Sequence, residues 1–334
     1  MTELDRSRAR YDGALAATIE GIANRIRQRG VELSLANGDR LDGRTCLVTG
    51  ANRGLGLAVA HDLAKRGGTL VLACRSGLDE TVAAIQKSAK RPELVTGVKL
   101  DLGDLESVEE TMVDLQGRGV KIDVTILNAG IVPREARRTR DGFDESFQVN
   151  FLANVLFSRR LLELDLVGSS PTIDLKPRIV VVSSESHRSS PTVDWPSFGT
   201  FRPWGMRQAV EQYGYGKLLL QLYTQELSRR LENLIAVHSL CPGAVRTDIG
   251  REAPSWAKPL LDVTMRAFFQ SPEHAAVPVV YLAASRAIES ETGIYLHARQ
   301  RKAPSEAATD PGSGRRIWDE AERLLSDAGH AVGE

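Results

Sequence analysis

The sequence contains little cysteine and no long apolar run, and both absences restrict what the protein can be. Its three cysteines, Cys46, Cys74 and Cys241, lie in predicted strands or at their ends. An odd number without paired spacing indicates buried thiols in a reducing compartment, not disulfides or a zinc site. No apolar run reaches the ~20 residues of a membrane span, and Met1–Asp5 lacks the basic and apolar regions of a secretory signal. We therefore predict a cytoplasmic protein without a membrane span.

The chain also lacks a net charge, since its 43 lysines and arginines equal its 43 aspartates and glutamates in number. This balance gives no indication of a nucleic-acid partner or of an anionic membrane surface. Hydrophobic residues make up 42% of the chain, which is enough for a sizeable core. Strand-like and helix-like segments alternate from Thr45 to Leu296 without a linker-like break, so we predict one α/β domain.

Residues 1 to about 40 precede the first predicted strand, and we interpret them as a helical N-terminal extension. Leu15, Ile19, Ile22 and Ile26 recur at helical spacing. One interpretation is a helix that lies on a membrane surface. We favour a helix that packs on its own domain or on a dimer partner, because acidic residues balance the nearby arginines.

A glycine-rich turn stands between the first strand and the first helix of the domain. Thr45–Thr49 is a short β-branched and apolar run typical of a buried strand, and Leu57–Arg66 is a good helix. Glycines in such a turn let the backbone approach a pyrophosphate at the helix N-terminus, where unpaired N–H groups and the helix dipole attract anions. We predict that this turn binds a dinucleotide through Gly50, Asn52, Arg53, Gly54, Leu55 and Gly56.

Tyr213 and Lys217 are spaced so that they share one face of a predicted helix. A positive charge beside a phenol favours the phenolate and lowers the pKa of the tyrosine, which makes the phenol usable as an acid near neutral pH. The spacing arises often by chance, so its weight depends on the motifs upstream.

Those motifs follow in one order along the chain. The glycine spacing is Gly-x-x-x-Gly-x-Gly, and the remaining motifs each end a predicted strand or lie in a helix: Asp101 at the end of Val98–Leu102, Asn128-Ala129-Gly130 after Val124–Leu127, Asn150 in a helix, Ser183-Ser184 after Ile179–Val182, and Pro242 to Thr247 after Ile235–Cys241. With these motifs the chain resembles the short-chain dehydrogenase/reductase family from about Gly43 to Leu325.

The resemblance implies a Rossmann-type, doubly wound parallel sheet of about seven strands with helices on both faces, in a single α/β domain. Residues 41–300 would form the dinucleotide-binding catalytic domain, with a substrate lid at about 248–270. Residues 301–334 would pack on that domain as a C-terminal segment.

The resemblance also implies roles for four residues. Ser184 would hydrogen-bond the carbonyl oxygen of the substrate, and Tyr213 would donate a proton to that oxygen. Lys217 would lower the pKa of Tyr213 and bind the nicotinamide ribose. Asn150 would hold a water that links the lysine to solvent. Further cofactor contacts are implied for Asp101, Leu102, Asn128, Ala129, Gly130, Tyr213, Lys217, Pro242, Gly243, Val245 and Thr247.

The choice of cofactor follows from the end of the second predicted strand, Thr69–Ser76. An acidic residue there binds the ribose 2′-hydroxyl of NAD, whereas an arginine accommodates the 2′-phosphate of NADP. This strand has no acid, and Arg75 stands near its end. Arg53 in the glycine turn could make a second charge-assisted contact to the same phosphate. We therefore predict NADP(H).

Neighbouring residues could be mistaken for the catalytic ones. Ser183 and Ser184 point in opposite directions on an extended chain, and the resemblance favours the second. Tyr215 has no lysine four residues later and is expected to pack or to line the pocket. His187 could be read as the base of a serine hydrolase, but no Gly-x-Ser-x-Gly turn surrounds Ser184. No metal-ligand spacing is present among the other histidines, His61, His238, His274, His297 and His330.

The segment between Ser184 and Tyr213, residues 185–212, is long for the family and rich in aromatic side chains. Similar lengthening occurs in the branch that includes retinol dehydrogenases and protochlorophyllide reductases, and three C-terminal pieces agree with it: Ser271–Ala276, Glu291–Tyr295 and Ile317–Glu320. A second aromatic segment, Pro254 to Gln270, lies where the family has its mobile lid. For any single aromatic residue, core packing is the better interpretation. Together the two segments favour a bulky, largely apolar substrate.

Three functions remain open at this stage. The leading one is interconversion of a carbonyl and an alcohol with NADP(H). The second is reduction of a carbon–carbon double bond, which would use the same tyrosine and lysine. The third is an NADP-sensing regulator without chemistry. The family resemblance also allows a homodimer through the helix from Gln212 to Leu231, whose leucines would suit such a contact.

Overall fold

The computed structural model describes residues 33, 35–36, 38–168, 175–190, 192–232, 234–243 and 270–333. Several sequence predictions lie outside these residues. They are the helical extension up to residue 32, the cofactor contacts of Val245 and Thr247, and the substrate lid at 248–269.

One sheet of eight strands organises the domain, in the order β3-β2-β1-β4-β5-β6-β7-β8. Neighbouring strands are parallel except for β7 and β8, which form an antiparallel pair. The bounds are β1 Thr45–Thr49, β2 Thr69–Cys74, β3 Val95–Lys99, β4 Val124–Leu127, β5 Arg178–Val182, β6 Ala236–Cys241, β7 Tyr295–His297 and β8 Gln300–Arg301. The predicted doubly wound parallel sheet is confirmed. The prediction of about seven strands was one short, because β8 has only 2 residues and leaves no periodic pattern.

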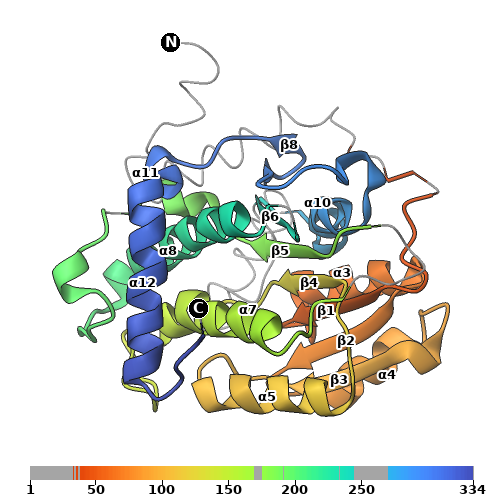
Figure 1. The fold of residues 1–334 in the computed structure, drawn as a ribbon, viewed down its shortest axis with the longest axis horizontal. Helices are drawn as coiled ribbons and strands as arrows, with labels where there is room; N and C mark the ends of the chain where they lie inside the picture. The colour runs from red at the N-terminus through yellow and green to blue at the C-terminus, as the bar shows by residue number, and fades with distance from the viewer. Residues whose placement is uncertain are drawn as a thin grey trace, which may run out of the picture.

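Helices cover both faces of this sheet (Figure 1). The longer ones are α3 Gly54–Lys65, α4 Leu78–Gln86, α5 Leu105–Gly117, α7 Ala153–Glu163, α8 Ala209–Arg230, α10 Pro272–Ala284 and α12 Pro311–Asp327. Successive strand residues point to opposite faces, so Leu47 packs in the core cluster with α5, α7 and α8, whereas Cys46 and Val48 pack in the cluster with α3 and α10. The side chains of both clusters are almost completely buried, and their packing fixes the positions of the strand ends.

The third strand begins and ends earlier than the sequence predicted. It spans Val95–Lys99 and pairs with β2 from Leu70 onward, whereas the prediction was Val98–Leu102. Glycine usually weakens a strand, so the presence of Gly97 kept the first half of β3 from being recognised as a strand in the sequence. A Cβ at Gly97 would lie 2.6 Å from the Leu78 side chain, so the glycine allows α4 to pack against the strand. Asp101 consequently lies in the loop after β3 and does not close the strand.

The C-terminal helix α12 lies across α8 and α7 (Figure 1). Trp318 of α12 stacks on Tyr223 of α8 with ring centroids 5.4 Å apart, and Glu322 forms an ion pair with Arg159 of α7. The guanidinium of Arg230 lies 4.1 Å from the Trp318 ring centroid. The leucines of α8 that suggested a homodimer contact are buried within the domain itself: Leu218, Leu219, Leu220, Leu222 and Leu227. Among the helices described, none is long and apolar enough to cross a membrane.

Candidate active site

The carboxyl ends of β1, β4, β5 and β6 lie side by side, because these strands are consecutive in the sheet. The strand order reverses beside β1, since the chain proceeds from β1 to β2 and β3 on one side and to β4 on the other. Ligands of doubly wound sheets bind outside the strand ends at such a point. The loops that leave these four ends contain the glycine turn, Asn128, Ser184 and Pro242.

The glycine turn requires its glycines for two different reasons. Gly50 and Gly54 have φ angles of 66° and 53°, in the left-handed region that favours glycine. A Cβ at Gly56 would lie 2.3 Å from the carbonyl oxygen of Gly50, so α3 can approach the turn only without a side chain there. A Cβ at Gly54 would meet nothing within 4 Å, and Arg53 at the N-cap position forms no side-chain cap hydrogen bond. The start of α3 thus faces open space with uncapped N–H groups, which fits the pyrophosphate of a dinucleotide.

Thr49 joins this turn to the end of β4, a role that the sequence did not reveal. Its hydroxyl accepts hydrogen bonds from the backbone N–H groups of Asn128 and Ala129, both at 3.0 Å. The Asn128 amide donates back to the Thr49 carbonyl at 2.8 Å. The predicted cofactor residue Asn128 is therefore oriented by the last residue of the first strand. A threonine at a buried strand end was the signal for this role, but it is a weak one.

Tyr213, Ser184 and Lys217 come together at the N-terminal half of α8. The side chain of Ser184 lies beside the phenol of Tyr213, where it favours the ionised form of that phenol. The ammonium of Lys217 lies 5.8 Å from the Tyr213 ring centroid and donates a 2.9 Å hydrogen bond to the carbonyl of Val182, the last residue of β5. The helix and the strand end thus place an acid, a hydroxyl and a cation next to one another.

Asn150 is fully buried in the π-helical turn Gln148–Leu152 before α7. Its side-chain oxygen accepts a 3.0 Å hydrogen bond from the Ile131 N–H, and its amide donates to the Ile131 carbonyl at 2.9 Å. A Cβ at Gly130 would lie 2.9 Å from the Asn150 oxygen and 3.5 Å from the Lys217 amine. Gly130 therefore leaves a space between the Asn150 side chain and the Lys217 amine that a side chain at position 130 would fill.

Burial shifts the pKa values of both titratable groups toward their neutral forms. Burial lowers the pKa of Lys217 to about 8. Burial also raises the pKa of Tyr213 to about 12, although the hydrogen bond with Ser184 acts in the opposite direction. The sequence led us to expect a lowered pKa for Tyr213. The structure gives the opposite direction, because the phenol lies in a poorly hydrated site and the lysine donates to a backbone carbonyl.

Comparison with known proteins adds a second line of evidence. A family model described as short chain dehydrogenase matches residues 44–198. Retinol dehydrogenase 13 of Mus musculus is 34% identical over 309 residues, covering 87% of this chain and 89% of that protein. A 3-oxoacyl-[acyl-carrier protein] reductase from Brucella melitensis in complex with NAD has a TM-score of 0.57 at 23% identity, covering 76% of this chain and 95% of that one. The angucycline C-6 ketoreductase LanV with bound NADP has a TM-score of 0.57 at 25% identity, covering 78% and 95%.

The chain belongs to the short-chain dehydrogenase/reductase family. The family resemblance predicted from the order of the motifs is thereby confirmed, as is the branch related to retinol dehydrogenases. The protein is an oxidoreductase of the class that interconverts carbonyl and alcohol groups, and solved structures that share its Rossmann-type fold hold NAD or NADP.

The loops after β2 and β3 of this short-chain dehydrogenase contain several of the residues predicted to contact the cofactor. The Asn52 amide donates to the Ser76 carbonyl at 3.1 Å, which ties the glycine turn to the end of β2. Arg75 is 61% exposed, and its guanidinium lies 3.9 Å from the Asp101 carboxylate. Two other predicted cofactor residues, Leu55 and Leu102, have buried side chains in the core, so only their backbone is available to a ligand.

The residues that compete with the catalytic set occupy different environments. Among the described residues, the buried Ser183 hydroxyl has no hydrogen-bond partner, whereas the Ser184 hydroxyl donates to the Ser186 hydroxyl at 3.2 Å and lies beside the Tyr213 phenol. Tyr215 packs against the core cluster. His187 accepts a 3.1 Å hydrogen bond from the Ser305 N–H at Nε2, so its Nδ1 carries the proton and donates to the Ser184 carbonyl at 2.6 Å. Burial lowers the pKa of His187 to about 4, and with both nitrogens engaged the ring is not placed to act as a base on Ser184.

The loop after β6 begins with Pro242 and Gly243. Gly243 has a φ angle of 84°, and its N–H donates to the Cys241 sulfur at 3.4 Å. The Gln270 amide donates to the Pro242 carbonyl from the far end of the segment predicted as the lid. Within the described part of the chain, no group of three or more His, Cys, Asp or Glu side chains could hold a metal ion.

The aromatic residues of the 185–212 segment cover the domain in different ways. Phe198 is buried against Phe147 with ring centroids 5.4 Å apart. The Trp204 indole donates to the Asp144 carboxylate at 3.0 Å, while Phe201 lies under the guanidinium of Arg138. Core packing was the better interpretation for Phe198. The segment packs over the residues between β4 and α7.

Proposed function

We propose that this short-chain dehydrogenase uses NADP(H) to interconvert a carbonyl and an alcohol on a bulky, largely apolar substrate, with Tyr213 as general acid and base. The observation that carries the proposal is that the Tyr213 phenol lies beside both the Ser184 side chain and the amine of Lys217. Two neighbouring hydroxyl groups can both donate a hydrogen bond to one carbonyl oxygen of a substrate.

The described residues supply the proton and the placement that the reaction needs. Bound NADPH would supply the hydride. Tyr213 is protonated at neutral pH, since its pKa is about 12, and the protonated phenol is the form required to donate to a carbonyl oxygen during reduction. Ser184 holds the same oxygen by a second hydrogen bond and stabilises the negative charge that develops on it.

Lys217 and Asn150 assist this proton transfer. With a pKa of about 8 the lysine is largely charged at pH 7, and its bond to the Val182 carbonyl directs the ammonium into the site. The remaining two N–H groups are available to the nicotinamide ribose and to the tyrosine. Asn150 lies across Gly130 from the amine, which supports the predicted water link between lysine and solvent.

The choice of NADP over NAD rests on Arg75. Its exposed guanidinium lies at the end of β2, where the adenosine ribose binds in this type of fold, and the 3.9 Å separation from Asp101 leaves it able to pair with a phosphate. Asp101 stands two residues beyond β3, and its carboxylate accepts a 2.9 Å hydrogen bond from the Gly103 N–H.

The proposed substrate class rests on the aromatic segment 185–212 and on the relative named retinol dehydrogenase. We expect faster NADPH-dependent turnover of retinal, a ketosteroid or benzil than of dihydroxyacetone or pyruvate. Absorbance of NADPH follows the reaction directly. Faster turnover of the two small polar substrates would contradict the proposed class. The cytoplasmic location and the homodimer through α8 stay predictions from the sequence.

Replacing Tyr213 with phenylalanine tests the mechanism. Tyr213→Phe removes the donated proton and leaves the ring, so kcat should fall by about 1,000-fold while the dissociation constant of NADPH stays within about twofold. Steady-state kinetics and cofactor fluorescence titration give the two quantities. Retained activity in this variant would show that another group is the acid.

Replacing Arg75 tests the cofactor. Arg75→Ala should raise the KM for NADPH about 10-fold, the effect of one lost charge-assisted hydrogen bond, and leave the KM for NADH unchanged. Arg118→Ala is a matched control, because that arginine is also exposed but pairs with Asp114 on α5. A preference of the wild-type enzyme for NADH would refute the assignment.

A further inference from the structure

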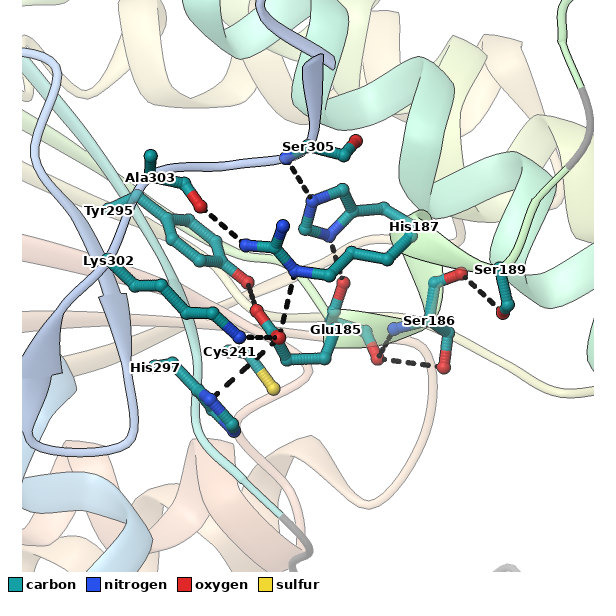
Figure 2. Close-up of polar contacts among 12 residues, drawn as sticks. Glu185, Ser186, His187, Ser189, Cys241, Tyr295, His297, Lys302, Ala303 and Ser305 are labelled. Atoms are coloured by element: carbon teal, nitrogen blue, oxygen red, sulfur yellow. Dashed lines mark hydrogen bonds and ion pairs between the residues drawn. The ribbon is translucent and has the colours of Figure 1, made fainter. Parts of the chain in front are cut away.

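The residue after Ser184 is a buried glutamate whose carboxylate has several partners. Glu185 is 6% exposed and opens the short 3-10 helix Glu185–Arg188. One carboxylate oxygen accepts a 2.7 Å hydrogen bond from the Tyr295 phenol. The other accepts from Arg188 at 2.9 Å and from the ammonium of Lys302 at 2.5 Å (Figure 2). Tyr295 lies in β7, and Lys302 directly follows β8, so the carboxylate connects the Ser184 turn to the last hairpin of the sheet.

Other residues of the same turn reach the same C-terminal segment. The Ser305 N–H donates to His187 at 3.1 Å, and the Arg188 guanidinium donates to the Ala303 carbonyl. Glu185, His187 and Arg188 therefore all contact residues 295–305, although more than a hundred residues separate the two segments in the chain. Figure 2 shows the turn on one side of this network and the C-terminal segment on the other.

The same turn also orients Ser184 directly. The Ser186 N–H donates to the Ser184 hydroxyl oxygen at 3.2 Å, and His187 donates to the Ser184 carbonyl at 2.6 Å. Any displacement of the turn would therefore move the hydroxyl that meets Tyr213. Within the described part of the chain, Ser184 is held by hydrogen bonds with Ser186 and His187, so its link to the C-terminal segment passes through residues 185–188.

We propose that Glu185 is a positioning residue of the reaction: its buried carboxylate anchors the Ser184 turn to β7 and to the segment after β8, and thereby sets where the Ser184 hydroxyl meets Tyr213 and the carbonyl oxygen of the substrate. The proposal rests on the proposed function, because it takes Ser184 to contact the substrate. Both carboxylate oxygens are occupied by protein donors, so Glu185 acts through Ser184 and not on the substrate itself.

The negative charge is essential to this anchor. Arg188 is buried and the Lys302 side chain is 16% exposed, and the carboxylate of Glu185 forms an ion pair with each of these cations. The His297 ring lies 3.8 Å from the same carboxylate. Removing one partner of a buried ionic cluster leaves the others uncompensated, which is more damaging than removing all of them together. An amide at position 185 would keep the shape of the side chain and lose the charge.

The test compares two glutamine substitutions at opposite ends of β5. Glu185→Gln removes the carboxylate beside Ser184. Glu289→Gln removes the partner of the buried Arg178 at the start of the strand and serves as the matched control. The Tm should fall in both variants, by about 5 to 10 °C. With NADPH and the best substrate of the panel above, kcat should fall about 10-fold or more in Glu185→Gln only, because small misplacements of a catalytic group are costly.

A double-mutant cycle shows whether the effect passes through Ser184. Glu185→Gln should lower kcat less than twofold when Ser184 is already alanine, since there is then no hydroxyl to place. Additive losses would show that Glu185 acts by another route and would overturn the proposal. A further variant, Glu185→Gln with Lys302→Gln, restores the native excess of one positive charge among residues 185, 188 and 302, and should recover most of the lost Tm.

Hydrogen exchange supplies a readout that needs no substrate. Exchange should speed up in peptides covering 183–190 and 295–305 of Glu185→Gln, and stay at the wild-type rate there in Glu289→Gln. Unchanged exchange or unchanged kcat in Glu185→Gln would overturn the proposal. If instead Ser184→Ala keeps full activity, the proposed role of Ser184 fails, and the exchange data still decide whether Glu185 holds the turn.

Discussion

Two buried titratable groups, Lys217 and Glu185, flank the turn that follows β5. Their surroundings favour the neutral form of the lysine and the charged form of the glutamate. On one side, Lys217 lies under Tyr213 with the Val182 carbonyl as its hydrogen-bond acceptor, and burial lowers its pKa to about 8. On the other side, burial raises the pKa of Glu185, but the charges of His297, Arg188 and Lys302 outweigh it and hold that pKa well below its ordinary value. Ser184 belongs to both neighbourhoods.

The difference shows how the same fold can contain one buried group suited to proton transfer and another that only fixes the local geometry. A buried charge with few compensating partners shifts toward its neutral form, and its protonation responds to whatever binds nearby. A buried charge inside a compensated cluster keeps its ionisation state and instead restricts the geometry around it. The lysine can therefore take part in proton chemistry, whereas the glutamate can only hold the turn in place.

The largest test of the comparison removes the residue that both sides share. Ser184→Ala should lower kcat about 100-fold, because the carbonyl oxygen loses one of its two hydrogen-bond donors. Ser183→Ala is the matched control: its hydroxyl is buried without a partner, so kcat should stay unchanged and the free energy of unfolding should not fall. Steady-state kinetics and thermal unfolding measure the two quantities. Equal losses of kcat in both variants would mean that the two serines were assigned wrongly.

A smaller effect is expected when Lys217 is replaced and unfolding is followed against pH. The folded-state pKa of about 8 lies below the ordinary 10.5, so between these values the unfolded chain binds a proton that the folded chain lacks. The contribution of Lys217 to stability therefore rises with pH across this window, by on the order of 2 kcal/mol. The unfolding free energy of the wild type minus that of Lys217→Met should therefore rise from pH 8 to pH 10. A flat difference would show that burial does not control this amine.

The smallest effect concerns acid and the glutamate cluster. The pKa of Glu185 is lower in the folded chain than its ordinary 4.5, so its stabilisation is complete above that value and is lost as the pH falls through the folded-state pKa. The Tm difference between wild type and Glu185→Gln should be constant from pH 5 to 7 and shrink below about pH 4. A difference that shrinks already near pH 6 would mean that a histidine carries the effect. The groups that face this carboxylate are His187, Arg188, Cys241, Tyr295, His297 and Lys302.

The sequence predicted which strand ends lie together more reliably than the details of the sheet. The glycine turn, Asn128, Ser184, Tyr213 and Lys217 follow strand ends or share a helix, and parallel strands bring those ends together whatever the exact lengths of the strands are. The limits of β3 were wrong because Gly97 interrupts the pattern for a reason of packing against α4. The hairpin strand β8 was missed because two residues carry no periodicity.

The order of the motifs along the chain determined the family and the doubly wound sheet, because each motif can be recognised locally, within a few residues of a strand end. Only the tertiary structure decided how burial moves the pKa values of Tyr213 and Lys217, and which residues compensate Glu185. Those outcomes depend on groups that lie far away in the sequence. Desolvation and ion pairing act through space, and a sequence pattern records neither.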